Sequence, residues 1–163
     1  MRTWQIISTV ILGRCVTVAA MSAETGTGAK MINDVQPEVV IDRLLTAIAQ
    51  RDLSATVACF SSGQDVAVVG SEAGERARGR EAVTEFFSRA YAKSGAYRFV
   101  LPTRELATHG NTAWIVADGS VADPMESESK PYRLTAVLIR EAGGYRVALW
   151  SGSEPVGARH QLI

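Results

Sequence analysis

The C-terminal part of the chain constrains the fold most strongly, because four strand-like segments follow one another there with only turns between them. These segments are rich in β-branched, aromatic and other apolar residues, and turn-forming residues bound them. Strands are predicted at 97–106, 112–121, 132–140 and 145–151, with His109-Gly110-Asn111 and Gly143-Gly144 as tight turns and 123–130 as an acidic loop. Pro102 indicates an edge strand or a bulge. Consecutive strands joined in this way form an antiparallel meander.

The part of the chain before residue 97 has helical spacing instead. Pro37 suits the first position of a helix that runs to Gln50, and Asp52 can cap a short second helix. A short strand at 66–69 and a polar loop from Ser71 to Arg80 come next. The clearest helix begins at Gly79-Arg80-Glu81 and stops before Gly95. Helices segregated from a meander define the α+β class and exclude a doubly wound sheet.

Composition sets the limits within which function can be sought. The chain has 163 residues, no formal net charge and 47% hydrophobic residues, which suits one globular domain. A balanced charge gives no electrostatic reason to expect nucleic acid or an anionic membrane as a partner. The two cysteines, Cys15 and Cys59, form no CxxC or Cys/His cluster. We therefore expect no disulfide, no metal site and no cofactor.

Residues 1–34 are predicted to be a leader and linker, and 35–156 the domain, with 157–163 as a tail. Arg2, the apolar run from Trp4 to Leu12 and the small residues near Ala20 follow the order of a secretory signal. Arg14 interrupts the apolar run, which is too short for a membrane span. The alternative is a misplaced start, with translation beginning at Met21 or Met31. Cleavage of the leader would make the protein exported or periplasmic, and otherwise it would be cytoplasmic.

The last two strands are apolar on both faces. Regular alternation in the last strand points Tyr145, Val147 and Leu149 inward and leaves Ala148 and Trp150 on the outer face. An exposed apolar face on a soluble protein usually meets a partner, so we expect a homodimer through this face. The alternative is that the C-terminal tail folds back over it.

Two stretches carry a resemblance to a known family. Phe60 is followed by Val66-Ala67-Val68-Val69-Gly70-Ser71, Glu75 and Gly79-Arg80-Glu81-Ala82-Val83, and the chain ends with Tyr145-Arg146-Val147 and Ser153-Glu154-Pro155. This pattern resembles the SnoaL-like branch of the nuclear-transport-factor-like superfamily, which also contains ketosteroid isomerases and scytalone dehydratases. The resemblance implies a cone of cystatin-like α+β type, in which a strongly curved, mostly antiparallel sheet wraps around the helices and a pocket opens at its wide end. It also implies homodimers through the outer face of the sheet.

The same resemblance guides the choice of pocket residues. Many members with a catalytic or ligand-gripping role carry histidines on the last strand, at positions that are Leu149 and Ser151 here, so a less polar pocket base is implied. His109, in a turn, and His160, in the tail, lack the partners of a catalytic triad. The predicted ligand-binding residues are Phe87, Tyr91, Trp114, Tyr132, Leu149 and Ser151.

Two carboxylates are candidates for proton transfer, because a carboxylate in an apolar pocket can act as an acid or base. Asp118 follows Trp114 and Val116 at strand spacing and would share their face; alternatively, Gly119 breaks the strand and Asp118 points to water. Glu75 would lie near the pocket mouth in the resembling folds; alternatively, it pairs on the surface with Arg76, Arg78 or Arg80.

The sequence therefore leaves three possible functions. The leading hypothesis is a domain that binds a small, largely apolar molecule. The second is a cofactor-free proton-transfer enzyme, such as an isomerase, cyclase or dehydratase, that uses Asp118. The third is a dimerising interaction module whose cavity is filled by its own side chains.

Overall fold

The computed structural model describes residues 35–155, except 94 and 124. The predicted leader and linker with Cys15, and the predicted tail with His160, lie outside this part of the chain. The described elements follow in the order α1–α2–β1–β2–α3–β3–β4–β5–β6. This order confirms the predicted α+β class, with one short strand, β2, added to it.

The first two helices begin and end where local chemistry favours it. Helix α1 (Pro37–Gln50) starts at a proline and buries its apolar side against the sheet. It ends at Arg51, which adopts the left-handed conformation with φ 56°. Helix α2 (Leu53–Ala58) is capped by Asp52, whose Oδ1 accepts a hydrogen bond from the Ala55 N–H at 2.9 Å. The predicted cap is confirmed.

Helix α3 (Arg80–Ala92) buries Val83 and Phe87. Its last turn leaves carbonyl groups without helical partners, and the Arg51 guanidinium donates hydrogen bonds to the carbonyls of Tyr91 and Lys93. The chain reversal between α1 and α2 is thereby tied to the end of α3.

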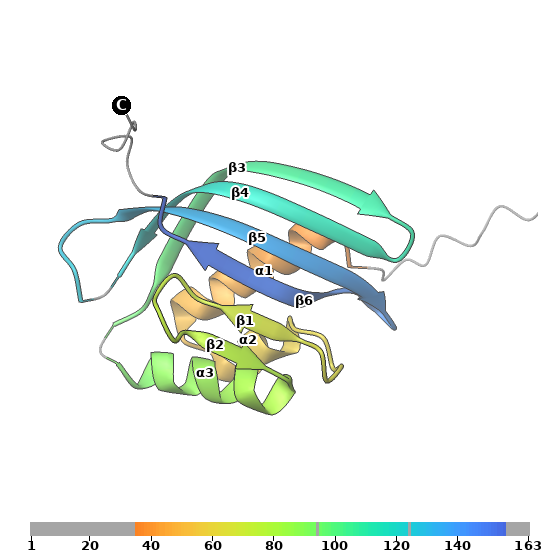
Figure 1. The fold of residues 1–163 in the computed structure, drawn as a ribbon, viewed down its shortest axis with the longest axis horizontal. Coiled ribbons are helices and arrows are strands. Elements are labelled where there is room, and N and C mark those ends of the chain that lie inside the picture. The colour runs from red at the N-terminus through yellow and green to blue at the C-terminus, as the bar shows by residue number, and fades with distance from the viewer. Residues whose placement is uncertain (1–34, 94, 124, 156–163) are drawn as a thin grey trace, which may run out of the picture. The chain divides into compact units, whose positions relative to one another are not determined.

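Six described strands form one open sheet in the order β2-β1-β6-β5-β4-β3. Their bounds are β1 Ala67–Val69, β2 Arg76–Arg78, β3 Arg98–His109, β4 Thr112–Ala122, β5 Lys130–Glu141 and β6 Gly144–Ser153. Strand β1 pairs with β6 in parallel, and every other pair is antiparallel. Figure 1 shows the long strands curving in front of α1, with α3 beside β1 and β2. The curved, mostly antiparallel sheet packed on helices is confirmed.

Strand β2 lies inside the segment that the sequence predicts to be a polar loop, so that prediction is wrong for residues 76–78. Only Ala77 of this strand is buried, while Arg76 and Arg78 are exposed. One small apolar residue between two arginines is too weak a pattern to indicate a strand. The pairing with β1, rather than any local preference, orders it.

Two irregularities decide which side chains face the helices. Strand β3 is an edge strand, and its register with β4 shifts between Val100 and Thr103, so both alternatives predicted for Pro102 occur. In β6, Val147 pairs with Leu138 and Leu149 pairs with Val137, so Ala148 is an extra residue in the strand. Such a bulge resets the alternation of side chains beyond it.

The bulge at Ala148 corrects the predicted orientation of β6. Trp150 is 4% exposed and lies on the inner face, beside the buried Ala136 and Val68. Its predicted place on the outer face is therefore wrong. Leu149 pairs with Val137 and Ala67 on the outer face, and Ser151 also lies there.

The core lies between the inner face of the sheet and the helices, and includes Ile41 and Leu44 of α1, Ile115 of β4 and Leu134 of β5, all completely buried. None of the helices between residues 35 and 155 is both long and apolar enough to cross a membrane.

Candidate functional site

A cavity of about 470 Å³ opens between α3, the β1–β2 connection and the inner face of the sheet. The apolar and aromatic part of its wall includes Ile48, Val68, Phe86, Phe87, Tyr91, Tyr97, Phe99, Val121, Tyr132 and Trp150. Charged residues complete the lining: Glu72, Glu75, Arg89, Lys93, Asp123, Lys130 and Glu154. The volume lies within the range of small-molecule sites, about 300–1,000 Å³. The domain thus contains space that its own side chains do not fill.

The aromatic rings of the wall contact one another in two groups. On α3, the Phe87 ring lies 5.3 Å from Phe86 and 6.0 Å from Tyr91, measured between ring centroids. On the sheet, Phe99 lies 4.9 Å from Tyr132 and 5.6 Å from Trp150. Because the rings are tilted or edge-on, each group supports its members in a fixed arrangement.

Tyr132 and Trp150 form a polar contact in the part of the cavity wall that the sheet provides. The Trp150 indole N–H donates a hydrogen bond to the Tyr132 hydroxyl oxygen at 3.2 Å, and this contact is buried. Burial raises the pKa of Tyr132 to about 12; the negative charges of Glu75 and Glu154 also raise this pKa, while the Trp150 hydrogen bond lowers it. The hydroxyl therefore keeps its proton at neutral pH.

The Tyr132 hydroxyl occupies space that is free only because position 152 has no side chain. Gly152 lies under it, and a Cβ atom at Gly152 would be 1.7 Å from the Tyr132 oxygen. A side chain at position 152 would displace Tyr132 from its hydrogen bond with Trp150.

A second tyrosine of the wall is held from the helix side. The Tyr91 hydroxyl is 2.7 Å from the Thr56 hydroxyl, and Thr56 is completely buried. Burial is the main cause that raises the pKa of Tyr91. Tyr91 and Tyr132 are thus two neutral hydroxyl-bearing rings, one on each side of the cavity.

Charged groups lie at the rim. Glu75 folds over Gly70, and its Oε2 accepts a hydrogen bond from the Glu72 N–H at 3.2 Å. Two of the three arginines proposed as its surface partners contact other groups: Arg78 pairs with Asp65 at 2.8 Å, and Arg80 donates to the Phe60 and Ser61 carbonyls. Glu75 is a lining residue of the cavity.

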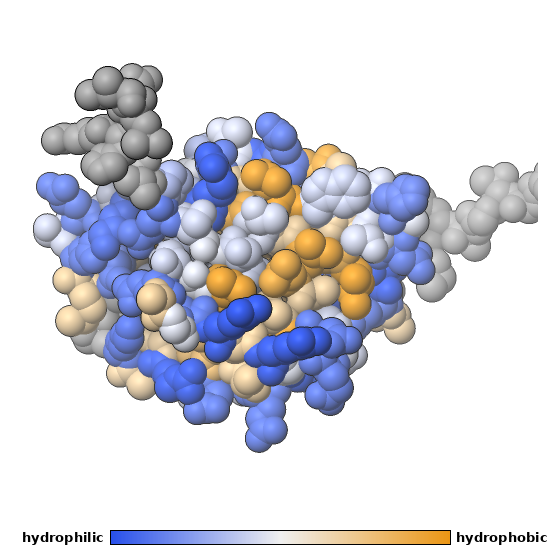
Figure 2. Space-filling view, in the orientation of Figure 1, coloured by the Kyte–Doolittle hydropathy of each residue, from blue (hydrophilic) through white to orange (hydrophobic). Residues whose placement is uncertain are grey.

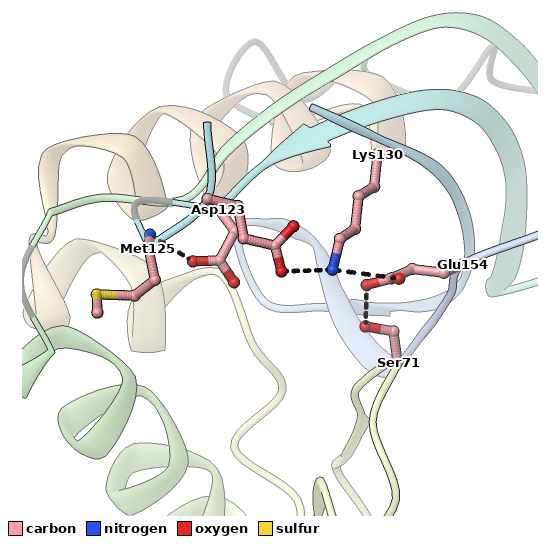
Figure 3. A network of polar contacts seen from close by, with 6 residues as sticks. Ser71, Asp123, Met125, Lys130 and Glu154 are labelled. Carbon is pink, nitrogen blue, oxygen red and sulfur yellow. Dashed lines mark hydrogen bonds and ion pairs between the residues drawn. The ribbon is translucent and has the colours of Figure 1, made fainter. Parts of the chain in front are cut away.

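A polar network joins three segments beside the cavity (Figure 3). The Lys130 ammonium lies 2.5 Å from Glu126 Oε1 and 3.9 Å from Glu154 Oε2. Glu154 Oε1 in turn accepts a hydrogen bond from the Ser71 hydroxyl at 3.2 Å. The network links the β4–β5 loop, the end of β6 and the β1–β2 connection, so the charge of Lys130 is compensated by two carboxylates.

Of the predicted ligand-binding residues, Phe87, Tyr91 and Tyr132 line the cavity. Leu149 and Ser151 do not, because the bulge at Ala148 turns both to the outer face. Trp114 is also outside the cavity: it is 42% exposed, since Ala113, Ile115 and Ala117 occupy the inner side of β4. The predicted place of Trp114, Leu149 and Ser151 in the cavity wall is therefore wrong.

Asp118 lies on the outer face of β4 as well. Its Oδ1 accepts a hydrogen bond from Arg133 Nε at 2.7 Å, and about half of each side chain is exposed (48% and 51%). The strand continues to Ala122, so Gly119 does not break it. The prediction that Asp118 faces the pocket is wrong, and with it falls the proton-transfer mechanism built on this residue.

Sequence reasoning missed several lining residues, among them Phe99 and Trp150. Both lie beside irregular pairings, where alternation counted from the far end of the strand gives the wrong face. Pro102 indicates the irregular pairing in β3, whereas Ala148 is an ordinary strand residue, so nothing in the sequence indicates the bulge in β6. Among residues 35–155, excluding 94 and 124, no cluster of histidine, cysteine and carboxylate side chains is arranged to hold a metal ion.

A curved open sheet, three helices between residues 35 and 155 and a cavity between them define an α+β domain with the sheet and pocket that the nuclear-transport-factor-like resemblance implies. The SnoaL-like domain family matches residues 38–157. The chain belongs to this family, as the sequence resemblance predicted. No curated protein matches the chain.

Solved structures support the same fold. A nuclear transport factor 2 (NTF2-like) superfamily protein from Salmonella enterica has a TM-score of 0.65 at 17% identity, over 76% of this chain and 92% of that one. A protein with a cystatin-like fold from Nostoc punctiforme has a TM-score of 0.60 at 14% identity, over 72% and 87%. A ketosteroid isomerase-like protein from Erwinia carotovora has a TM-score of 0.54 at 18% identity, over 73% and 93%. At these identities the likeness establishes the fold.

Proposed function

We propose that this domain binds a small, largely apolar molecule in the cavity between α3 and the sheet. The observation that carries the proposal is the group of aromatic and aliphatic side chains that lines one part of about 470 Å³ of space, with charged side chains such as Glu75 and Lys130 around the rest. Apolar cavities with a few fixed polar groups are the usual form of small-molecule sites. Removal of an apolar molecule from water into this wall supplies the binding free energy.

The other two functions are less well supported. An interaction module with a filled cavity requires side chains in the space that the structure leaves open. A proton-transfer enzyme requires a carboxylate inside the cavity, and Asp118 is outside it. Glu75 lines the cavity, but its carboxylate accepts a hydrogen bond from the Glu72 N–H and is held against the β1–β2 connection. Binding rather than a particular reaction is therefore the function that the geometry supports best.

The proposal is tested by filling the cavity from α3. Ala90 lines the cavity, whereas Ser88 on the same helix is exposed to solvent. We expect Ala90→Trp to weaken the binding of acetylnaphthalene, a neutral aromatic probe, by about tenfold or more, because the indole occupies the space that the probe needs. Calorimetric titration of the full chain measures the affinity.

Ser88→Trp is the matched control and should bind the probe like the unmodified protein. It introduces the same side chain on the same helix without entering the cavity. Equal affinity of the two tryptophan variants, or no saturable binding of the probe by the unmodified protein, would contradict the proposal.

We also propose that two copies of the chain meet through the outer face of the sheet. This face carries an apolar group formed by Trp114, Val116, Val137, Ile139 and Leu149, which we call the outer patch. Figure 2 shows hydrophobic side chains gathered over β5 and β6 on this face. The outer patch replaces the predicted pair Ala148 and Trp150, since Trp150 is buried inside.

The charges beside the outer patch do not oppose a second copy. Asp118 and Arg133, both half-exposed, pair with each other on adjacent strands next to the patch, so each compensates the charge of the other. A two-fold arrangement would place the apolar patch of one copy against the same patch of the other. Burial of the exposed Trp114 ring would provide an aromatic anchor for the contact.

Trp114→Glu should convert the dimer into a single chain, because a carboxylate placed in an apolar contact loses its hydration without gaining a partner. Light scattering during size-exclusion chromatography gives the mass. Ser88→Glu, which adds the same charge on α3, should leave the mass at that of two chains. A single-chain mass for the unmodified protein would refute the dimer.

A further inference from the structure

We infer that a groove between α1 and α2 is a second binding site, separate from the cavity of the proposed function, and that it takes carboxylic acids with an elongated aliphatic body. The groove has a volume of about 560 Å³ and is lined mainly by residues of α1 and α2, with Arg146 of β6 beside them. Among the residues that the structure describes, it shares none with the lining of the first cavity. The inference therefore goes beyond the proposed function and does not depend on it.

Two guanidinium groups line the groove. Arg43 on α1 is exposed, and Arg146 on β6 is half-buried. Within the described part of the chain no carboxylate pairs with either of them: Arg43 has no hydrogen-bond partner, and Arg146 donates to the Tyr145 carbonyl at 2.8 Å. A guanidinium carries five N–H donors in a planar fork that matches a carboxylate. Both arginines thus have donors left for an anionic ligand.

The charges of the two arginines act on the same point of the groove, the thiol of Cys59. This thiol is buried and lines the groove. Burial raises the pKa of the Cys59 thiol, and the positive charges of Arg146 and Arg43 oppose this rise. Because the pKa stays above its ordinary value, the thiol keeps its proton at neutral pH. It therefore adds no negative charge that would repel an anion held by the arginines.

The acidic residues around the groove do not cancel its positive charge. Asp42 is the acidic residue among the described lining residues, and Arg104 pairs with it at 2.6 Å. Glu38 and Asp52 are exposed and do not line the groove. Two arginines without acidic partners leave the lining with a net positive charge, which favours a negatively charged ligand.

Aliphatic side chains provide most of the remaining lining: Val35, Val39, Val40, Ala47, Ala55 and Ala58. Val39 is 41% exposed although it is large and apolar, so a ligand that covers it gains by removing it from water. A helix rises about 1.5 Å per residue, so positions 39–50 of α1 extend over about 16 Å. In contrast to the first cavity, no aromatic ring of the described residues lines this groove. An elongated aliphatic body fits this lining better than an aromatic one.

The test compares three ligands that carry the same octyl chain and differ in the charge of the end group: octanoate, octanol and octylammonium, each below its micelle concentration. We expect the full chain to bind octanoate about fivefold to tenfold more tightly than octanol, because the carboxylate gains charge-assisted hydrogen bonds with the arginines. Octylammonium should bind more weakly than octanoate. Added sodium chloride should weaken octanoate binding and leave octanol binding nearly unchanged. Calorimetric titration measures the affinities.

Arg43→Gln and Arg146→Gln should each bring the affinity ratio of octanoate to octanol closer to one. Arg78→Gln is the matched control: it removes the same charge from a side chain that is 76% exposed and lines neither the groove nor the first cavity, so it should keep the ratio. Ala90→Trp, which fills the first cavity, should also keep the ratio. Binding of acetylnaphthalene should in turn survive Arg43→Gln.

Equal affinity of the unmodified protein for octanoate and octanol, preferred binding of octylammonium, or no binding of octanoate overturns the inference. A ratio that survives Arg43→Gln or Arg146→Gln, or that falls as far in Arg78→Gln, also overturns it. Loss of octanoate binding in Ala90→Trp would place octanoate in the first cavity and would overturn the inference as well. None of these outcomes decides the proposed function, which the binding of acetylnaphthalene tests separately.

Discussion

Gly119→Ala is expected to destabilise the domain by about 3 kcal/mol or more, in the range of severe overpacking. The added Cβ would lie 1.9 Å from the Val100 carbonyl oxygen and 2.9 Å from the Leu101 Cα. Both contacts are with backbone, so no side-chain rotation can relieve them. The β3 strand would have to move away from β4 at the irregular pairing that turns Phe99 into the cavity.

Urea unfolding followed by circular dichroism measures this effect. Gly63→Ala is the matched control, because the nearest atom to its added Cβ is the Ser61 hydroxyl at an ordinary 3.4 Å. This control should change the unfolding free energy by about 0.5 kcal/mol or less. An unfolding midpoint for Gly119→Ala close to that of Gly63→Ala would show that β3 and β4 do not approach as described.

Gly152→Ala is expected to have the second largest effect, a loss of about 2–3 kcal/mol in stability together with loss of probe binding. The added Cβ would lie 1.7 Å from the Tyr132 oxygen and 2.6 Å from its Cζ. Tyr132 would have to leave its place, and its hydrogen bond with Trp150 would break. Stability and structure of the wall would thus change together.

The collision predicts a partial rescue that an unrelated loss of stability would not show. Tyr132→Phe removes the oxygen that makes the closest contact, so the double variant should be more stable than the sum of the two single effects implies. The contact with Cζ remains, which limits the recovery. A double-mutant cycle by urea unfolding measures the coupling, and strict additivity would refute the described contact.

The helices could be predicted because their signals are local. Pro37, the Asp52 cap and the spacing from Val83 to Tyr91 each act within a few residues, and the structure places α1, α2 and α3 accordingly. The strands could be predicted for the same reason, except β2, whose order depends on pairing with β1. The family resemblance then supplied the architecture that local patterns could not.

The faces of the strands were harder to predict than the strands themselves. In β4 both alternating sets are apolar, and the inner set is the smaller one, Ala113, Ile115 and Ala117, while the larger Trp114 lies outside. The size of the side chains rather than their hydrophobicity decides which set faces the helices, because the helices leave little space on the inner side of β4. The assignment of Asp118 and Trp114 to the cavity failed for this reason. Phe87, Tyr91, Tyr132 and Glu75 line the cavity.

The extra residue Ala148 has a consequence for how chains of this family can vary. Without it, β6 would show its later side chains on the same faces, since the residues after it would alternate regularly from Val147. The strand would lose only its local bend and twist. An alignment of two such chains that leaves no gap at this position would therefore match residues of the cavity wall with residues of the outer face.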